Sequence, residues 1–311
     1  MRVALIDGKK TNVNLDKRNA VNFRNFVILK NILECELLVS FPDLIKNQNT
    51  KYDIVILGFG GQSSEIDYTK KIIDNSDKCF FMSGEYEQTT NRALDYTEKP
   101  FSIIRNYTGK NKIAHKNRQT NDFILNLNLL IAKQSNELTS KKYDCIYYGR
   151  WREDRKDYFK KYIQGGLYLS TSTKNMKKFK HEGCNPKYLD TINWTDKKET
   201  LNLFRYSLYI EDKFTHNIFN NLANRYYEAG FCNAVVFFDV NCINTIRKSE
   251  IAEYENEIQN YLVTDYNSLQ DKINECNQDF EKHLTIQKSW RKNELKLRAK
   301  MIEDFKQIIY Q

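Results

Sequence analysis

The sequence lacks long apolar runs and has little proline and glycine, and each shortage excludes a class of protein. No apolar run reaches the ~18 to 20 residues that span a bilayer, and the strand-like start at 1–7 lacks the layout of a signal peptide. We therefore expect a protein without a membrane partner that is made and kept in a cytoplasm. Only 3 Pro and 11 Gly occur in 311 residues, which argues against a disordered chain or a repetitive fibre.

Cysteine and histidine are too scattered to form a recognisable framework. The seven cysteines are odd in number and include no CxxC pair, and the four histidines are equally dispersed. A disulfide framework needs paired cysteines, and a zinc site needs closely spaced Cys or His ligands. The sequence indicates neither of them.

What the chain does have is length, apolar content and positive charge. A chain of 311 residues is about twice a typical domain, so two domains with separate cores are expected. Hydrophobic residues make up 41% and aromatics 13%, which is ample for packed cores. The 49 Lys and Arg exceed the 40 Asp and Glu and give a formal charge of +9. Such an excess attracts a polyanion or serves only solubility, and both interpretations stay open.

The first half alternates strand-like apolar runs with helical patterns. Strands are predicted at 1–7, 36–40, 52–57 and 79–82, and helices at 18–33 and 66–75. This alternation indicates βα units and a parallel sheet, so the first domain is expected to be Rossmann-like. The sequence Gly58-Phe59-Gly60-Gly61 follows one strand, where open α/β sheets bind ligands, although a simple tight turn explains it equally well.

A basic region from 99 to 118 interrupts this alternation. Its basic residues are Lys99, Arg105, Lys110, Lys112, Lys116 and Arg118, and Phe101 and Tyr107 lie between them. Basic residues interleaved with aromatics are typical of a surface that contacts a nucleic-acid backbone and stacks on bases. A solvated basic loop is an equally good interpretation. A second basic region, expected to be irregular, covers 174–188, and 135–142 is the best candidate for a linker.

The second half begins with a strand followed by an arginine-rich loop. The run Tyr143–Tyr148 ends at Gly149, and Arg150, Arg152 and Arg155 follow within six residues. A helix to about Gln164 comes next. The sheet directs such a loop towards a ligand cleft, so its arginines and the amides that begin the helix are expected to converge on a phosphate.

The stretch from Ser207 to Asp239 organises the second half. A short strand at 208–210 precedes a helix whose apolar residues recur between 218 and 229, and a buried strand at 234–238 follows. Arg225 and Glu228 lie three residues apart, beside the apolar face of that helix. A guanidinium can hold a diphosphate with two parallel hydrogen bonds, and a carboxylate can accept from ribose hydroxyls. A solvated ion pair is the alternative.

Together these features resemble the GT-B glycosyltransferases, and most of all the DNA β-glucosyltransferase family of T-even bacteriophages. The family transfers glucose from UDP-glucose to 5-hydroxymethylcytosine in duplex DNA. The resemblance rests on YDCIYYGRWREDR, SLYIEDK, RYYEAGFCNAVVFFD and NYLVTDYNSLQDKINE in the second half, and on MRVALID, YDIVILGFGG and CFFMSGE in the first. It covers most of the chain, with insertions between 83 and 143.

The resemblance implies an α/β fold of two Rossmann-like domains whose parallel sheets face a central cleft. Residues 1–140 would form the acceptor and DNA-binding domain, and 141–285 the nucleotide-sugar domain. The terminal helix, 286–311, would cross back to the first domain. The protein would be a monomer, located in the host cytoplasm if a bacteriophage encodes it.

The resemblance also assigns roles to individual residues. Glu228 would hold the ribose and Arg225 the diphosphate, while Arg152 and Arg155 would approach the phosphates from the loop after Gly149. Glu85 would be the catalytic general base, with Glu87 in reserve, although the family uses an aspartate there. The DNA-binding candidates are Arg105, Lys110, Lys112, Lys116 and Arg118.

An inverting transfer needs a carboxylate opposite the leaving UDP to take the acceptor proton, and positive charge beside the diphosphate. No DxD motif occurs, so no metal bound by a dedicated carboxylate pair is expected, although the family's use of divalent cations leaves room for Mg²⁺ or Mn²⁺. A duplex base would have to leave the stack to reach the cleft.

Two other functions remain open. One is a cytoplasmic GT-B enzyme acting on a saccharide, lipid-linked or protein acceptor, and the other is a non-catalytic DNA-binding protein with this fold. The sugar and the choice between 5-hydroxymethylcytosine and 5-hydroxymethyluracil also stay open.

Overall fold

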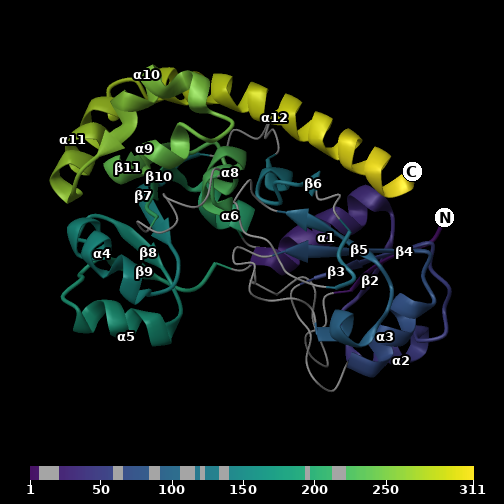
Figure 1. Cartoon of the computed structure of the whole chain (residues 1–311). Helices are drawn as coiled ribbons and strands as arrows, with labels where there is room; N and C mark the ends of the chain where they lie inside the picture. The colour runs from purple at the N-terminus through teal and green to yellow at the C-terminus, as the bar shows by residue number, and fades with distance from the viewer. Residues whose placement is uncertain are drawn as a thin grey trace. The chain divides into compact units, whose positions relative to one another are not determined.

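The computed structural model describes residues 1–6, 21–58, 66–83, 92–105, 116–119, 123–132, 140–192, 197–211 and 222–311. The chain divides into two compact units (Figure 1). Unit 1 comprises Met1–Leu130 and Ala299–Gln311, and unit 2 comprises Ile131–Arg298. Among the helices of these described ranges, none combines the length and the apolarity needed to cross a bilayer.

Unit 1 is built on a six-stranded parallel sheet in the order β2-β1-β3-β4-β5-β6. Its strands are β1 (Val3–Ile6), β2 (Glu36–Leu38), β3 (Ile54–Leu57), β4 (Lys78–Ser83), β5 (Phe101–Arg105) and β6 (Phe123–Ile124). Its helices are α1 (Val21–Leu33), α2 (Phe41–Asn47), α3 (Ile66–Asp74) and the short η3 (Arg92–Tyr96). The strand order reverses direction between β1 and β3, so this sheet has its switch point there.

Two apolar cores cover the two faces of this sheet. Leu44 of α2 and Ile72 of α3 pack on one face, and Phe26 of α1 packs on the other. Every residue of β1 and β3 is buried, which explains why these strands are continuous apolar runs in the sequence rather than alternating ones.

Unit 2 is built on a second six-stranded parallel sheet, in the order β12-β11-β10-β7-β8-β9. Its strands are β7 (Tyr143–Tyr148), β8 (Tyr168–Ser170), β9 (Lys187–Leu189), β10 (Phe204–Tyr209), β11 (Val235–Asp239) and β12 (Leu262–Val263). Its helices are α4 (Lys156–Tyr162), α5 (Thr173–His181), α6 (Lys197–Asn202), α8 (Asn224–Phe231), α9 (Ile243–Ile246), α10 (Glu255–Ile258) and α11 (Tyr266–Asn277), with short turns η5 (Glu153–Arg155), η6 (Val240–Cys242), η7 (Ala252–Tyr254) and η8 (Gln259–Tyr261).

The path of the chain through this second sheet creates a switch point between β7 and β10. The chain runs outward from β7 through β8 to β9, returns to the other side of β7 as β10, and continues to β11 and β12. Helices that follow adjacent strands diverge at such a point, and ligands of open α/β sheets bind in the crevice outside the carboxyl ends of the strands there.

The last helix, α12 (Phe280–Tyr310), contributes to both units. In unit 2, Trp290 is fully buried and meets the ring of Tyr261 edge-on at 5.5 Å. In unit 1, Phe305 and Ile309 enter the core beside α1. Figure 1 shows α12 as one continuous yellow helix, and it begins at Phe280, earlier than the expected start near 286.

Three local expectations from the sequence are wrong. The basic region 99–118 contains the buried strand β5, so a solvated loop is wrong for 101–105, and Phe101 has no exposed surface with which to stack on a base. Residues 106–115 lie outside the described residues, and DNA contact by the basic side chains of this region stays a prediction. The second basic region is not irregular, because it forms α5 and β9. The helix expected from 218 begins only at Asn224, after an extended Ala223, and 212–221 lie outside the described residues.

Candidate functional site

The candidate site lies in unit 2, at the switch point where β7 and β10 end. These neighbouring strands finish at Tyr148 and Tyr209. The arginine-rich loop follows β7, and Ile210 and Glu211 follow β10. Since parallel strands present their carboxyl ends at one edge of the sheet, the two segments are brought together there.

A buried carboxylate, Glu211, joins two arginines at this edge. Arg155 donates from Nη2 to Glu211 Oε2 at 2.5 Å, and Arg225 donates from Nη1 to Glu211 Oε1 at 3.1 Å. Glu211 is 2% exposed and Arg155 is 6% exposed. Two guanidinium groups thus converge on one buried carboxylate, which concentrates basic side chains at this edge of the sheet.

Arg225 is held in a fixed orientation by its surroundings. Nη1 also donates to the carbonyl oxygen of Ile210 at 2.6 Å. The guanidinium lies over the rings of Tyr147 and Tyr209, 5.1 and 5.9 Å from their centroids, an arrangement that cation–π attraction stabilises. The hydrogen bonds to Ile210 and Glu211 both come from Nη1. A guanidinium has further N–H donors on Nε and Nη2, so the group can also bind an oxyanion.

Glu228 lies one turn along α8 from Arg225 but has a different partner. Its Oε2 accepts a hydrogen bond from Tyr148 Oη at 2.5 Å, and Tyr148 is the last residue of β7. Glu228 is 5% exposed, and 15% of the Arg225 side chain is exposed. A solvated ion pair between Arg225 and Glu228, the alternative drawn from the sequence, is therefore wrong.

The loop after β7 is anchored by Gly149 and Trp151. The Gly149 carbonyl accepts from Thr171 Oγ1 at 2.7 Å, and a Cβ at this glycine would lie 3.2 Å from Tyr147 Oη. Trp151 is buried, packs edge-on against Phe179 at 5.0 Å, and donates from Nε1 to Glu153 Oε2 at 3.0 Å. These contacts set the path of the chain towards Arg155.

Arg152 does not join the cluster. Its side chain is 45% exposed and makes a bidentate pair with Asp154, from Nε at 3.0 Å and from Nη2 at 2.6 Å. Of the predicted phosphate ligands, the structure thus brings Arg155 and Arg225 together and leaves Arg152 on the surface. Glu228, the predicted ribose ligand, lies one helical turn from Arg225.

The predicted residues of unit 1 are more dispersed. Arg105 ends β5, whereas Arg118 forms a bridge beside Phe101 at the start of β5, a separation of about 13 Å along the strand. Lys116 is exposed and pairs with Glu98 at 2.7 Å. Glu85, Glu87, Lys110 and Lys112 lie outside the described residues.

Sequence reasoning missed Glu211, Tyr148 and Asn224. The signal for Glu211 was present, because this acid directly follows the buried run 208–210 and so had to lie at the carboxyl end of a strand. Nothing in the sequence distinguished Asn224, a 4% exposed residue at the start of α8 whose side-chain amide atoms make no hydrogen bond.

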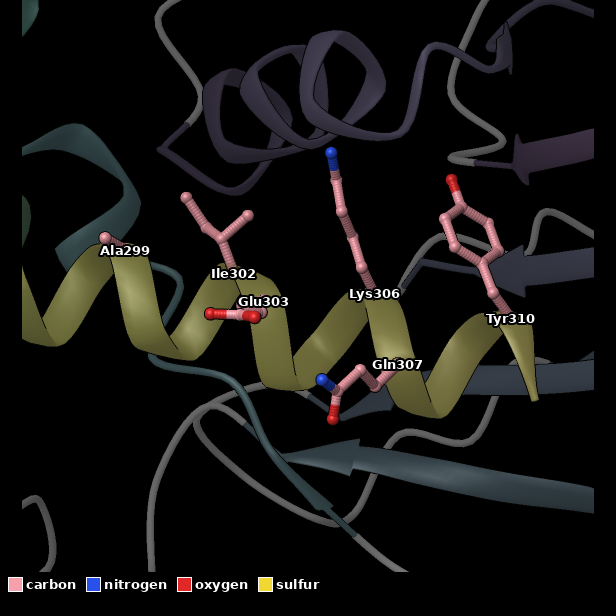
Figure 2. Close-up of a pocket in the computed structure, with 6 residues that line it drawn as sticks. All are labelled: Ala299, Ile302, Glu303, Lys306, Gln307 and Tyr310. Atoms are coloured by element: carbon pink, nitrogen blue, oxygen red, sulfur yellow. The ribbon is translucent and has the colours of Figure 1, made fainter.

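Metal-binding groups and hollows are two other features that could mark a functional site in the described ranges. No group of three or more His, Cys, Asp or Glu side chains is placed there to hold a metal ion. A shallow hollow of about 500 Å³ on the unit 1 end of α12 is lined by Ala299, Ile302, Glu303, Lys306, Gln307 and Tyr310 (Figure 2). Tyr310 there donates to the Leu33 carbonyl of α1 at 3.3 Å, so this side chain helps to hold α12 against α1.

Two parallel Rossmann-like sheets joined by a shared terminal helix define the GT-B class of glycosyltransferase folds. A scan against protein-family models and a search of curated proteins found no match for this chain. A search of solved structures did find proteins with a similar fold.

The DNA-modifying enzyme β-glucosyltransferase, solved with and without uridine diphosphoglucose, has a TM-score of 0.72 and 18% identity, covering 100% of both chains. The T4 phage enzyme BGT in complex with UDP and Mn²⁺ has a TM-score of 0.71 and 18% identity, covering 99% of both. An α-glucosyltransferase in complex with UDP and a 13-mer DNA containing an HMU base has a TM-score of 0.60 and 10% identity, covering 97% of this chain and 99% of that one. The GT-B fold and the resemblance inferred from the sequence are confirmed.

Proposed function

We propose that this protein is a UDP-sugar-dependent DNA glycosyltransferase that transfers a sugar, glucose in the first instance, to the hydroxymethyl group of a modified pyrimidine. The observation that carries the proposal is the buried Arg155–Glu211–Arg225 cluster at the switch point of unit 2. It occurs in a fold that matches DNA glucosyltransferases over the whole chain.

The donor would bind across the ends of β7 and β10. Arg155 and Arg225 would hold the diphosphate, because guanidinium groups can donate paired hydrogen bonds to phosphate oxygens. Glu228, one turn along α8, would accept from the ribose hydroxyls. Buried and fixed cations stabilise charge that develops on a leaving diphosphate more strongly than solvated ones do, because they need no reorganisation.

The transfer itself would be a single displacement at the anomeric carbon. The acceptor hydroxyl oxygen forms a bond to C1 from the side opposite UDP, the bond from C1 to the UDP oxygen breaks, and the anomeric configuration inverts. Glu85, with Glu87 in reserve, would take the hydroxyl proton, and the electron pair would leave on UDP beside Arg155 and Arg225. Mg²⁺ or Mn²⁺ would assist at the diphosphate, as suggested by the UDP and Mn²⁺ complex of the T4 phage enzyme.

Duplex DNA is proposed as the acceptor because of the net charge and the relatives of the fold. The chain carries a formal charge of +9, and an α-glucosyltransferase of similar fold was solved with UDP and DNA containing an HMU base. Phosphate contacts position a duplex without reading sequence. Arg105, Lys110, Lys112, Lys116 and Arg118 are the proposed contacts. Extruding the base costs a few kcal/mol, which such contacts would offset.

The proposal is tested by transfer from a panel of UDP-sugars onto duplex DNA that contains 5-hydroxymethylcytosine, 5-hydroxymethyluracil or unmodified bases. Nucleoside mass spectrometry should show a gain of one hexose on a modified base only. Glu85→Gln should abolish the gain, and Glu303→Gln, a change to an exposed acid on α12, should leave it intact. If no duplex gains mass while UDP-sugar still binds, the acceptor is a saccharide, lipid or protein and the DNA assignment fails.

A further inference from the structure

Asn224 is a buried amide without a hydrogen-bond partner. It is the first residue of α8, it is 4% exposed, and neither Oδ1 nor Nδ2 makes a hydrogen bond to any residue that the structure describes. Gln287 of α12, another buried amide in unit 2, has hydrogen-bond partners for both of its polar atoms. Its Oε1 accepts from the Val236 N–H at 2.8 Å, and its Nε2 donates to the Val236 carbonyl at 3.0 Å.

An unpartnered amide of this kind lowers the stability of the unliganded protein. Burying a polar group without a partner costs about 1–3 kcal/mol, and native structures satisfy nearly all such groups. A leucine, whose side chain has the same number of heavy atoms as asparagine, would carry no such cost. The fold alone therefore does not explain why an amide occupies this position. A ligand that forms hydrogen bonds with the amide would explain it.

The surroundings of Asn224 are those of the candidate site. Asn224 and Glu228 are four residues apart on α8, so their Cβ atoms are about 5–6 Å apart on one side of the helix. Arg225 is its neighbour in the chain. The N-cap residue Ala223 has no side-chain acceptor for the first-turn amides of α8, so this helix start offers backbone donors beside the Asn224 amide.

We propose that Asn224 binds the ribose of the donor nucleotide together with Glu228, an inference that rests on the proposed function. A carboxylate can only accept hydrogen bonds, whereas an amide both donates and accepts. With Glu228 accepting from one ribose hydroxyl, Asn224 Oδ1 accepts from the other and Nδ2 donates to a hydroxyl oxygen. The amide atoms of Asn224 and the ribose hydroxyls then all have hydrogen-bond partners. Since only a nucleotide with ribose hydroxyls supplies these partners, the site prefers a ribonucleotide.

The test combines two substitutions, two nucleotides and one stability measurement. Calorimetric titration would give the affinities of the full chain, Asn224→Leu and Asn224→Ala for UDP and for 2′,3′-dideoxy-UDP, and thermal unfolding would give Tm without ligand. Asn224→Leu should raise or preserve the unliganded Tm, because it removes an unpartnered amide. Both variants should bind UDP about tenfold more weakly, the effect of about one lost hydrogen bond, while their affinity for the dideoxynucleotide stays that of the parent.

Gln287→Leu is the matched control, since it removes a buried amide whose partners are all within the protein. It should lower Tm and leave UDP affinity unchanged. The inference is overturned if both Asn224 variants bind UDP as the parent does, or if they lose affinity equally for both nucleotides, which would place the amide at the diphosphate or base. Those results leave the proposed function intact when the parent binds UDP, whereas a parent that binds no UDP overturns both.

Discussion

At the scale of single residues, the account depends on Glu211. This carboxylate is buried between Arg155 and Arg225 and is the one acid that both guanidiniums contact among the described residues. Two like charges held close together in a buried place repel each other. The Glu211 carboxylate lowers this repulsion and orients both arginines before a donor binds.

Replacing Glu211 with glutamine should therefore destabilise the unliganded protein. Removing one partner of a buried ion pair costs about 3–5 kcal/mol, and saturating UDP should recover part of this loss because its diphosphate supplies negative charge to the same guanidiniums. Thermal unfolding with and without UDP measures both effects. Glu255→Gln is the control, since Glu255 pairs with Arg247 on the surface, where an ion pair contributes about 0–1 kcal/mol. Equal losses for the two variants would contradict the role of Glu211.

The arginines should also differ from one another. Arg225→Lys keeps the charge but cannot donate to Ile210 and Glu211 and also present a second edge to the diphosphate. We expect it to weaken UDP binding by at least about tenfold, the effect of one charge-assisted hydrogen bond. Arg152→Lys, at the exposed Asp154 pair, should weaken it less. Calorimetric titration decides, and a larger loss for Arg152→Lys would show that this arginine turns inward to the donor.

At the scale of elements, the sequence predicted strands better than it predicted short helices. The runs that became β7, β10 and β11 were readable because both faces of a parallel sheet are buried. Helix α5 was missed because only Phe179 of its residues is buried, so its apolar pattern is weak. The Ser172 side chain caps the helix by accepting from the Asn175 N–H. The start of α8 was misplaced because Leu222 and Ala223 continue the apolar period although Ala223 is extended, with ψ of 159°.

The candidate site was predictable in its chemistry and not in its partners. The residue types and spacing of Arg225 and Glu228 indicated a nucleotide site. Their contacts with Glu211 and Tyr148 depend on strand order and register, which place β10 beside β7. One sequence does not determine such long-range pairing.

The packing of α8 against α12 should make stability depend on pH. Burial raises the pKa of the Glu294 carboxyl to about 7. Tyr226 Oη donates to this carboxyl, the buried Arg291 lies nearby, and Glu250 adds a repelling charge. The folded protein therefore holds a proton that the unfolded chain, titrating near pH 4.5, releases. The stability from this proton is full below about pH 4.5 and is lost as the pH rises through about 7.

Glu294→Gln should flatten this pH dependence, because its amide oxygen still accepts from Tyr226 and no proton is released. Thermal unfolding between about pH 5 and 8 should show the parent losing about 1–3 kcal/mol with rising pH, and the variant losing less. Glu253→Gln, at an exposed acid that pairs with Asn293, should follow the parent. Identical slopes for the parent and Glu294→Gln would mean that this carboxyl is ionised in the folded protein.

At the scale of the whole molecule, two parallel sheets with separate cores share the terminal helix α12. Phe305 in the core of unit 1 and Trp290 in unit 2 lie on this one helix. The binding site proposed for the donor belongs entirely to unit 2, whereas the proposed base, Glu85, belongs to unit 1. Under the proposed function, donor binding depends on residues of unit 2, and removal of the acceptor proton depends on a residue from the chain segment assigned to unit 1.

The most direct measurement compares UDP release with hexose gain in the same reaction, using UDP-glucose and a duplex containing 5-hydroxymethylcytosine. The account predicts one UDP released for each hexose found on the DNA, with both products strongly reduced in Arg225→Lys and in Glu85→Gln. UDP release in excess of hexose gain, at a rate that does not depend on the duplex, would show hydrolysis without transfer. Such a result would contradict the proposal that this fold modifies DNA.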